Sequence, residues 1–528
     1  MEQNSFLSSD MPQELLTGYA PPPAVMSPVK PHYEVQPHDH LFAWLCLPLG
    51  FVFMRYVLHN YSSYLTTAVF LVLHLLGMLY IRRSGCRPQL SQRIFGAVLC
   101  AFTAVFSLTS SMLVNFMCIL FLLAGEIWRI HAVCGGIPFV TRYFPLDLAS
   151  SLGKPLSMIG AAPSALADSA KHSKSMKSVR TIILSLFITI PLTVVVGMLL
   201  SSADSGMQVI FEKIGDLFTR DAKKMIFEML CGIPLGFILF GIWFSGAKRR
   251  ENGFLTDEEH ADTLSTFRII SNLSIYAGIT PICLMYLAYI CTQTSYFFSA
   301  FAGKLPSDMI YSEYARRGFF ELCAIAVINL IVILVVNGCA KDGGEKRPKM
   351  LTLYVTVLCG CTLFIISTAV AKMLLYIHAY GLTRQRLFTT WFMLLLGIGF
   401  ICLILRQYIR KFPTAAVFSA AFIGMFGLLC FSRPDALIAE YNITRYEQGT
   451  LKELDVKALS SLSDDAYGVM MQHMDTIRAA GKLPSILSTL MSRGDDLENA
   501  DFRRWNLSSE AFLSDYCVFR DAWRAQNG

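Results

Sequence analysis

The stretch "YSEYARRGFFELCAIAVINLIVILVV", residues 311–336, decides the fold class of this chain. Its first half holds four charged side chains within nine residues, and its second half holds none. An uncharged apolar run of this kind approaches the ~20 residues that a helix needs to cross a bilayer. The charges therefore mark the mouth of a segment that belongs in a protein core or in a membrane.

The composition of the whole chain places it in a membrane. The mean hydropathy is +0.49 and 16% of residues are charged, whereas about a quarter are charged in an ordinary soluble domain. The sequence therefore predicts an all-α, polytopic transmembrane helix bundle with the lipid bilayer as its first partner. The eleven predicted spans are 41–59, 65–81, 93–109, 111–128, 179–200, 225–245, 266–291, 318–337, 351–376, 386–405 and 413–432.

Basic residues in the short connections set the predicted orientation, because Lys and Arg accumulate on the cytoplasmic side. Every second connection is basic, starting with Arg82, Arg83 and Arg87, and we expect these connections in the cytoplasm. Residues 1–40 are rich in proline with little to bury, so they are predicted to form a disordered cytoplasmic head. With an odd number of spans, the tail after residue 432 is expected outside the cytoplasm.

The tail, 433–528, is predicted to form a small helical domain. It holds fifteen acidic and eleven basic residues, while the rest of the chain has a net charge of +11. This balance argues against a nucleic-acid partner, because phosphate binding needs clustered Lys and Arg. Apolar residues recur at steps of three and four. The predicted helices fall within 451–462, 463–482, a segment starting at 483, and 507–525.

The charged stretch 311–322 is predicted to open the eighth span. Glu313, Arg317 and Glu321 are four residues apart, so on a helix Arg317 can pair with either carboxylate. An unpaired charge this close to hydrocarbon would be costly, so we expect pairing.

A second polar stretch, 371–392, joins spans nine and ten on the same predicted side. Gly381 is expected to end one helix and Thr383 to cap the next. Arg384 and Arg386 open that second helix, where the helix dipole disfavours cations. Their position requires another cause, such as an acidic partner or an anionic ligand.

A third stretch, 433–446, leaves the last span on that side, so the three stretches together predict a polar cluster at the outer membrane boundary. Its predicted members are Glu313, Arg316, Arg317, Glu321, Lys372, Tyr376, His378, Tyr380, Arg384, Arg386, Arg433, Asp435, Tyr441, Asn442 and Arg445.

The same stretches resemble the signature segments of a known family. "EYARRGFFEL", "LLYIHAYGLTRQRLFTTWF" and "RPDALIAEYNITRY" are similar to segments of the bacterial multi-pass membrane family called domain of unknown function 4173, formerly grouped with 4153. "LSSLSDDA", residues 459–466, resembles a fourth, weaker segment. The resemblance covers roughly 180–450. It implies a bacterial inner-membrane protein and supplies no catalytic residues.

Metal, cofactor and enzyme motifs are not found in the sequence. Almost all of the fifteen cysteines lie in or beside spans, where a thiol packs as a small apolar side chain. Their spacing is not that of a zinc site. None of the sequence motifs of hydrolases, zinc proteases, phosphate loops or kinases appears. We therefore predict no metal and no cofactor, and a non-enzymatic role is favoured over an enzymatic one.

Three interpretations of the polar cluster stay open. Its charges can anchor helix ends, with Glu126 and Arg129 forming a similar pair elsewhere. They can recognise an envelope molecule or a partner protein, or they can form a proton pathway. The first functional hypothesis is therefore a scaffold or sensor-like component that recognises a partner through this cluster. The alternatives are a secondary transporter, with helices broken at Gly278 and Pro281, and an envelope-modifying enzyme.

The orientation is tested by mapping cysteine accessibility. A single reactive cysteine placed in the tail, or in the connection 376–386, should be labelled by an impermeant thiol reagent from outside the cell. Labelling of both positions only after the cytoplasm is opened would reverse the topology.

Overall fold

The structure is a computed structural model. It describes residues 34–58, 63–141, 143–171, 220–248, 270–301, 319–340, 348–409, 411–481, 483–500 and 505–527, with isolated positions between 185 and 199 and between 262 and 268. Apart from an isolated β-bridge between Ile270 and Ala340, its regular structure in these ranges is helical.

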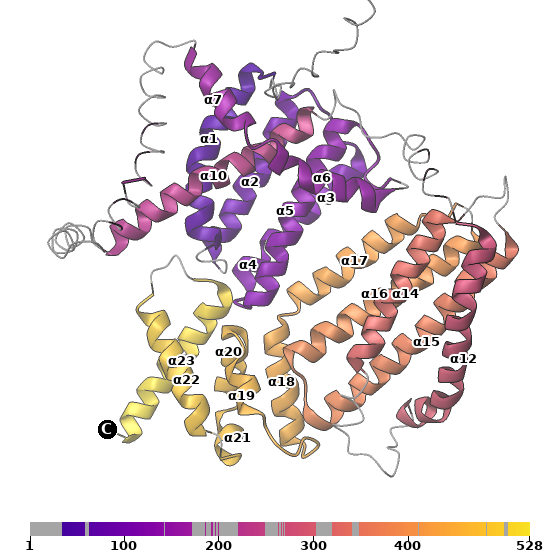
Figure 1. Ribbon diagram of the computed structural model, residues 1–528. Helices are drawn as coiled ribbons and strands as arrows, with labels where there is room; N and C mark the ends of the chain where they lie inside the picture. Colours follow the sequence, from indigo (N-terminus) through magenta and orange to yellow (C-terminus); the bar gives the residue numbers. More distant parts are fainter. Residues whose placement is uncertain are drawn as a thin grey trace, which may run out of the picture.

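A first bundle is formed by the amino-terminal helices (Figure 1). Its members are α1 (Pro37–Phe53) with the π-helical turn η2 (Met54–Leu58), α2 (Tyr64–Arg83), α3 (Leu90–Thr103), α4 (Val105–Leu108), α5 (Met112–Gly135), α6 (Phe144–Ser157), α7 (Ala161–Lys171) and α10 (Arg220–Lys248). Helix α1 begins at Pro37, so the last four residues of the predicted head, 37–40, are helical; residues 1–33 lie outside the described part.

A second bundle and a tail domain complete the fold, with the tail domain below the first bundle and beside the second in Figure 1. The second bundle consists of α12 (Asn272–Phe301), α14 (Phe319–Cys339), α15 (Lys349–Tyr380), α16 (Arg384–Tyr408) and α17 (Thr414–Phe431). The tail domain consists of α18 (Pro434–Glu447), α19 (Val456–Ser460), α20 (Asp464–Gln472), α21 (Met474–Ala479), α22 (Leu483–Glu498) and α23 (Leu507–Asn527).

The prediction of an all-α polytopic bundle is confirmed. Ten helices within the described residues are long and apolar enough to cross a membrane, and they correspond to ten of the eleven predicted spans. The remaining span, 179–200, lies outside the described ranges except for single positions. Helices α5 and α10 run in the same direction, because Ile130 lies against Gly246 while Glu126 and Trp243 both lie beside Gly77. The end of α5 and the start of α10 therefore lie at opposite ends of the bundle.

Glycines let α1 and α10 pack backbone against backbone. Gly232 and Gly236 are four residues apart on α10, and a Cβ on Gly50 of α1 would collide with backbone atoms of both. In lipid the hydrophobic effect does not drive helices together, so close packing at small residues takes its place. At one end of this contact Arg55 pairs with the buried carboxylate of Glu228 at 3.1 Å.

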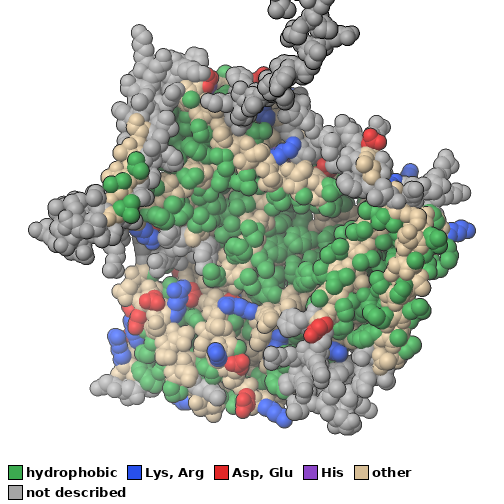
Figure 2. All heavy atoms as spheres, in the orientation of Figure 1, with side chains coloured by type: hydrophobic (Ala, Val, Ile, Leu, Met, Phe, Trp, Pro, Cys, Tyr) green, Lys and Arg blue, Asp and Glu red, His purple; other side chains and the backbone are tan. Residues whose placement is uncertain are grey.

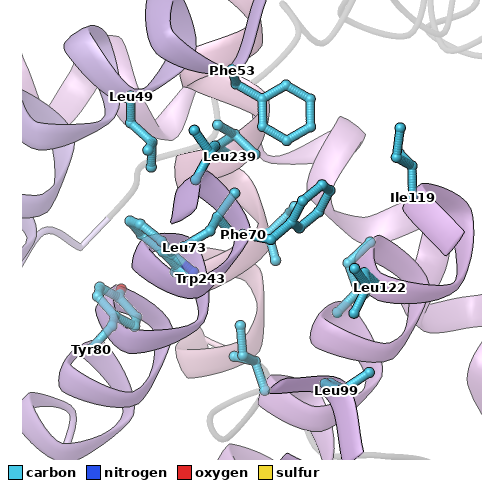
Figure 3. Packing of buried hydrophobic residues seen from close by; sticks show 14 of the residues in the cluster. Leu49, Phe53, Phe70, Leu73, Tyr80, Leu99, Ile119, Leu122, Leu239 and Trp243 are labelled. Carbon is cyan, nitrogen blue, oxygen red and sulfur yellow. The ribbon is translucent and has the colours of Figure 1, made fainter. Parts of the chain in front are cut away.

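Aromatic and aliphatic side chains from α1, α2, α3, α5 and α10 fill the core of the first bundle (Figure 3). Phe53, Phe70, Leu73, Tyr80 and Trp243 are all buried in it. Tyr80 stacks on Trp243 with ring centroids 6.2 Å apart. This packing fixes α1, α2 and α10 relative to one another.

The two bundles meet through aromatic rings. Phe426 of α17 stacks on Phe102 of α3 at 5.6 Å and lies 5.2 Å from Phe121 of α5. Trp391 of α16 donates its indole N–H to a carbonyl of α17, which holds α17 to the second bundle. Helix α17 is therefore shared by both bundles. Figure 2 shows hydrophobic side chains across both of them and charged side chains gathered over the tail domain.

The glycine contact predicts a position-specific loss of stability. Gly236→Val should destabilise the first bundle by about 1–3 kcal/mol, because the new side chain must push α1 away. The measurement is the midpoint of thermal unfolding in detergent. Gly278→Val on α12 is the matched control, since a Cβ there meets nothing within 4 Å. Equal effects of the two substitutions would contradict the close α1–α10 contact.

Candidate functional site

Two of the three polar stretches lie together where α16 and α18 begin. Arg384, the first residue of α16, donates from Nε to Asp435 at 2.7 Å and from its terminal nitrogen at 2.5 Å. The Asp435 side chain is fully buried and the Arg384 side chain is 31% exposed. Arg384 also donates to the carbonyl of Ser461 in the tail domain, at 2.8 Å. Arg384 thus has an acidic partner, which is one of the two causes predicted for its position at a helix start.

The turn between α15 and α16 forms as predicted and is held by the third stretch. Gly381 has φ +80°, in the region that favours glycine, and the Thr383 hydroxyl accepts from the backbone N–H of Arg386. The side chain of Asn442 on α18 bonds to both backbone groups of Leu382, accepting at 2.7 Å and donating at 2.8 Å. A Cβ on Gly381 would collide with Asn442, so the glycine serves both the backbone turn and this contact.

Two arginines cap the carboxyl end of α15. Arg386 donates to the carbonyls of Tyr380 and Gly381, and its guanidinium lies 4.1 Å from the centre of the Tyr376 ring. Arg445 of α18 donates to the carbonyl of His378 at 3.0 Å. Cations are favourable at the negative end of a helix. Both side chains are therefore engaged by this end of α15.

Other predicted members of the cluster have different places. Tyr441 accepts a hydrogen bond from Arg445 through its hydroxyl. Lys372 is buried within α15, while the His378 side chain and Glu321, near the start of α14, are exposed. The remaining three predicted members, Glu313, Arg316 and Arg317, lie outside the described residues.

The central residue of this region is Asp465, which was not among the predicted site residues. Its side chain is fully buried. One carboxylate oxygen accepts from Thr109 at 2.5 Å and from the backbone N–H of Ser110 at 3.1 Å, both in the first bundle. The other accepts from Arg433 at 2.8 Å and from Ser508 of α23 at 2.6 Å. A single carboxylate therefore bonds to the first bundle, to the end of the last span and to the tail domain.

Arg433 adopts an unusual backbone conformation at this junction. Its φ is +51°, and it is the only non-glycine residue with positive φ in the described ranges. Such a conformation costs on the order of 1–2 kcal/mol. The bonds of its side chain to Asp465 and Ser508 hold it there. This turn directs α18 away from the last span and towards the tail domain.

An ion pair with a buried carboxylate stabilises the tail domain internally. Asp464, next to Asp465, is buried and accepts two hydrogen bonds from Arg493 of α22, at 2.7 and 2.9 Å. These bonds raise the pKa of the Arg493 guanidinium above its usual value. Near α21, donors from Thr476 and His473 lower the pKa of the Glu447 carboxyl. Asp464 thus stabilises the tail domain internally, whereas Asp465 joins the tail domain to the bundles.

A second group of buried charges lies in the first bundle. Glu126 pairs with Arg129 as the sequence suggested, with Nε to oxygen at 2.9 Å, and the same carboxylate is 3.0 Å from Nδ1 of His74 on α2. All three are buried. This group joins α2 to α5.

The arrangement defines a class of protein. It is an all-α, multi-pass membrane protein in which an extramembrane helical domain is docked on two helix bundles through buried carboxylates. The chain belongs to the family described as Domain of unknown function (DUF4153), whose model matches residues 47–473. The match includes the first bundle, beyond the region of resemblance, whereas the assignment to the family numbered 4173 stays a prediction. No curated protein and no solved structure matches the chain.

Asp465→Asn should loosen the tail domain from the first bundle. The amide keeps the shape but removes the charge and places an N–H₂ group against donors, at a cost of about 2–4 kcal/mol. Limited proteolysis of the purified chain should then cut faster within 449–463, the segment that contains α19 and leads into α20. Asp475→Asn in α21 is the control, because that side chain is fully exposed. Unchanged proteolysis in Asp465→Asn would show that the carboxylate does not fasten the domain.

Proposed function

We propose that this chain is a non-enzymatic, sensor-like component of a bacterial plasma membrane, in which the tail domain recognises an envelope molecule or partner protein outside the cytoplasm. The observation that carries the proposal is the set of bonds to Asp465. Any partner that moves α20 or α23 acts on a carboxylate shared with both bundles. A change in the position of the tail domain then reaches both bundles through Asp465 and the polar cluster.

The partners of the cluster arginines support this role over direct anion recognition. Arg384 is bonded to Asp435, Arg386 to carbonyls of α15, and Arg445 to the same helix end. Side chains already engaged in this way would have to leave their partners to bind a ligand. They are better suited to fix one helix against another. A contact that passes movement from the tail domain to the bundles, here called the joint, requires such fixed helices.

A small pocket in the tail domain is the recognition site that we favour. It has a volume of about 190 Å³ and is lined by Leu497, Trp505, Ser509, Glu510, Leu513, Ser514 and Cys517. The buried indole N–H of Trp505 has no hydrogen-bond partner in the described structure. The carbonyl of Trp505 accepts from the backbone N–H of Tyr64, at the start of α2. A ligand that bonds to this indole would therefore press on a residue that contacts the first bundle.

The features required by a transporter are weaker. Helix α12 continues through Gly278 and Pro281 without interruption. Asn329 is buried and is bonded to its neighbours, accepting from Tyr286 and donating to Thr362. These polar groups join α12, α14 and α15 to one another. Recognition is therefore favoured over transport.

The predicted orientation is part of the proposal. Helix α2 ends with Arg82 and Arg83, and α10 ends with Lys248. These ends lie away from the tail domain, because the start of α2 bonds to it and Trp243 of α10 stacks on Tyr80 near the end of α2. The basic residues lie on the side of the bundles opposite the tail domain, and they support a cytoplasmic location for that side.

Filling the pocket tests the coupling. Leu513→Trp should mimic an occupied pocket and speed amide hydrogen exchange at Tyr64 and Ser110 by roughly tenfold, equivalent to about 1.4 kcal/mol of lost protection. The measurement is exchange mass spectrometry on the full chain in lipid nanodiscs. Val518→Trp on the same helix is the control, since Val518 is 72% exposed and does not line the pocket. Exchange that stays at the wild-type rate in Leu513→Trp would refute coupling through the joint.

Recognition itself is tested by photo-crosslinking in cells. A photoreactive residue at Ser514, in the pocket, should capture one defined envelope molecule, and Leu513→Trp should abolish the product. The same residue at Val518 should not capture it. Equal capture at the two positions would reject the pocket as the recognition site.

A further inference from the structure

A second, larger pocket lies at the end of the bundles opposite the tail domain. It has a volume of about 690 Å³ and is lined by Val140, Thr141, Arg406, Lys411, Phe412, Pro413, Thr414, Ala415 and Ala416. These residues come from the α5–α6 connection on one side and, on the other, from the end of α16, the connection after it and the first turn of α17. The pocket is therefore formed by both bundles together, where they separate beyond their aromatic contact.

The two charged side chains that line this pocket are both positive. Arg406 and Lys411 are exposed, and within the described ranges neither has a hydrogen-bond or ion-pair partner. Across the pocket, the Thr141 hydroxyl donates at 2.6 Å to Asp147, a buried carboxylate that is not among the lining residues. Two cations thus face a volume within the usual range of ligand sites.

The pocket lies at the level where a membrane ends. Helix α16 ends at Tyr408 and α17 begins at Thr414, so the lining residues lie where headgroups are found. Tyr408 is 65% exposed, as is typical of an aromatic side chain at the membrane interface. A basic pocket between transmembrane helices at this depth is a known arrangement for binding anionic headgroups.

The surface beyond the pocket is suited to acyl chains. Only 17% of the residues in the apolar span of α17 are buried inside the protein. Val417 and Leu428 of this helix are exposed, at 39% and 74%. A free phosphate would use the cations alone, whereas a phospholipid would use both the cations and this apolar helix.

We propose that this pocket binds the headgroup of an anionic phospholipid, with Arg406 and Lys411 as its cationic ligands and the lipid chains along α17. The lipid would occupy the space between the two bundles and keep them apart at this end. The site shares no lining residue with the tail pocket proposed above.

The test is native mass spectrometry of the full chain released from nanodiscs of phosphatidylcholine containing phosphatidylglycerol. The wild type should retain phosphatidylglycerol. The double variant Arg406→Gln/Lys411→Gln should bind it roughly 25-fold more weakly, since each removed cation weakens binding about fivefold. Lys411→Arg should retain binding. The matched control is Arg82→Gln/Arg83→Gln, which removes two exposed cations from the same side but outside the pocket.

Three outcomes would overturn the proposal. The first is that the double variant retains the lipid as the wild type does. The second is that the control variant loses the lipid to the same extent as the double variant, which would indicate general surface charge. The third is that millimolar inorganic phosphate displaces the lipid fully, which would assign the site to free phosphate. A photoreactive phosphatidylglycerol gives a second measurement, because its crosslinks should fall within 406–416 in the wild type even if the double variant does not fold.

Discussion

The carboxylate of Asp465 is the constraint on which the arrangement of the three parts depends. A charge withdrawn from water is tolerated only if donors replace its hydration. Here the donors are Thr109 and Ser110 from the first bundle, Arg433 from the end of the last span, and Ser508 from the tail domain. Moving any of these parts removes donors from a buried charge. The bundles and the tail domain are consequently tied to one set of positions.

The lipid environment explains why a polar joint is needed. Apolar helices gain little by leaving lipid for one another, so their association relies on close packing and on polar contacts. Within the first bundle, the glycines of α1 and α10 supply close packing. Between the bundles, the contact is a set of aromatic rings around Phe426. Such rings can slide over each other, whereas hydrogen bonds to a buried carboxylate fix direction as well as distance.

Local features were predictable from the sequence, and long-range pairings were not. Ten spans and the turn at Gly381 and Thr383 follow from hydropathy and capping, which depend on neighbouring residues. The sequence also predicted that Arg384 and Arg386 need an acidic partner or an anionic ligand, but several aspartates were available and spacing did not select Asp435. Helix α18 was missed because residues 433–446 have no apolar excess. Asp465 was missed as well, since its bond to Thr109 joins residues 356 positions apart. The segment "LSSLSDDA" was the one feature that pointed towards it.

The tail-side contact between the bundles and the basic pocket lie at the two ends of α17. Helix α17 has 18 residues, so it is about 27 Å long at 1.5 Å per residue. A rotation of about 10° at its tail-side end would displace its other end by about 5 Å, by the same geometry. Small changes at the joint would therefore appear as large changes in the width of the basic pocket. A headgroup bound between Thr141 and Lys411 would resist such a change. Under the two proposals, a change in the position of the tail domain would thus alter the width of the basic pocket through α17.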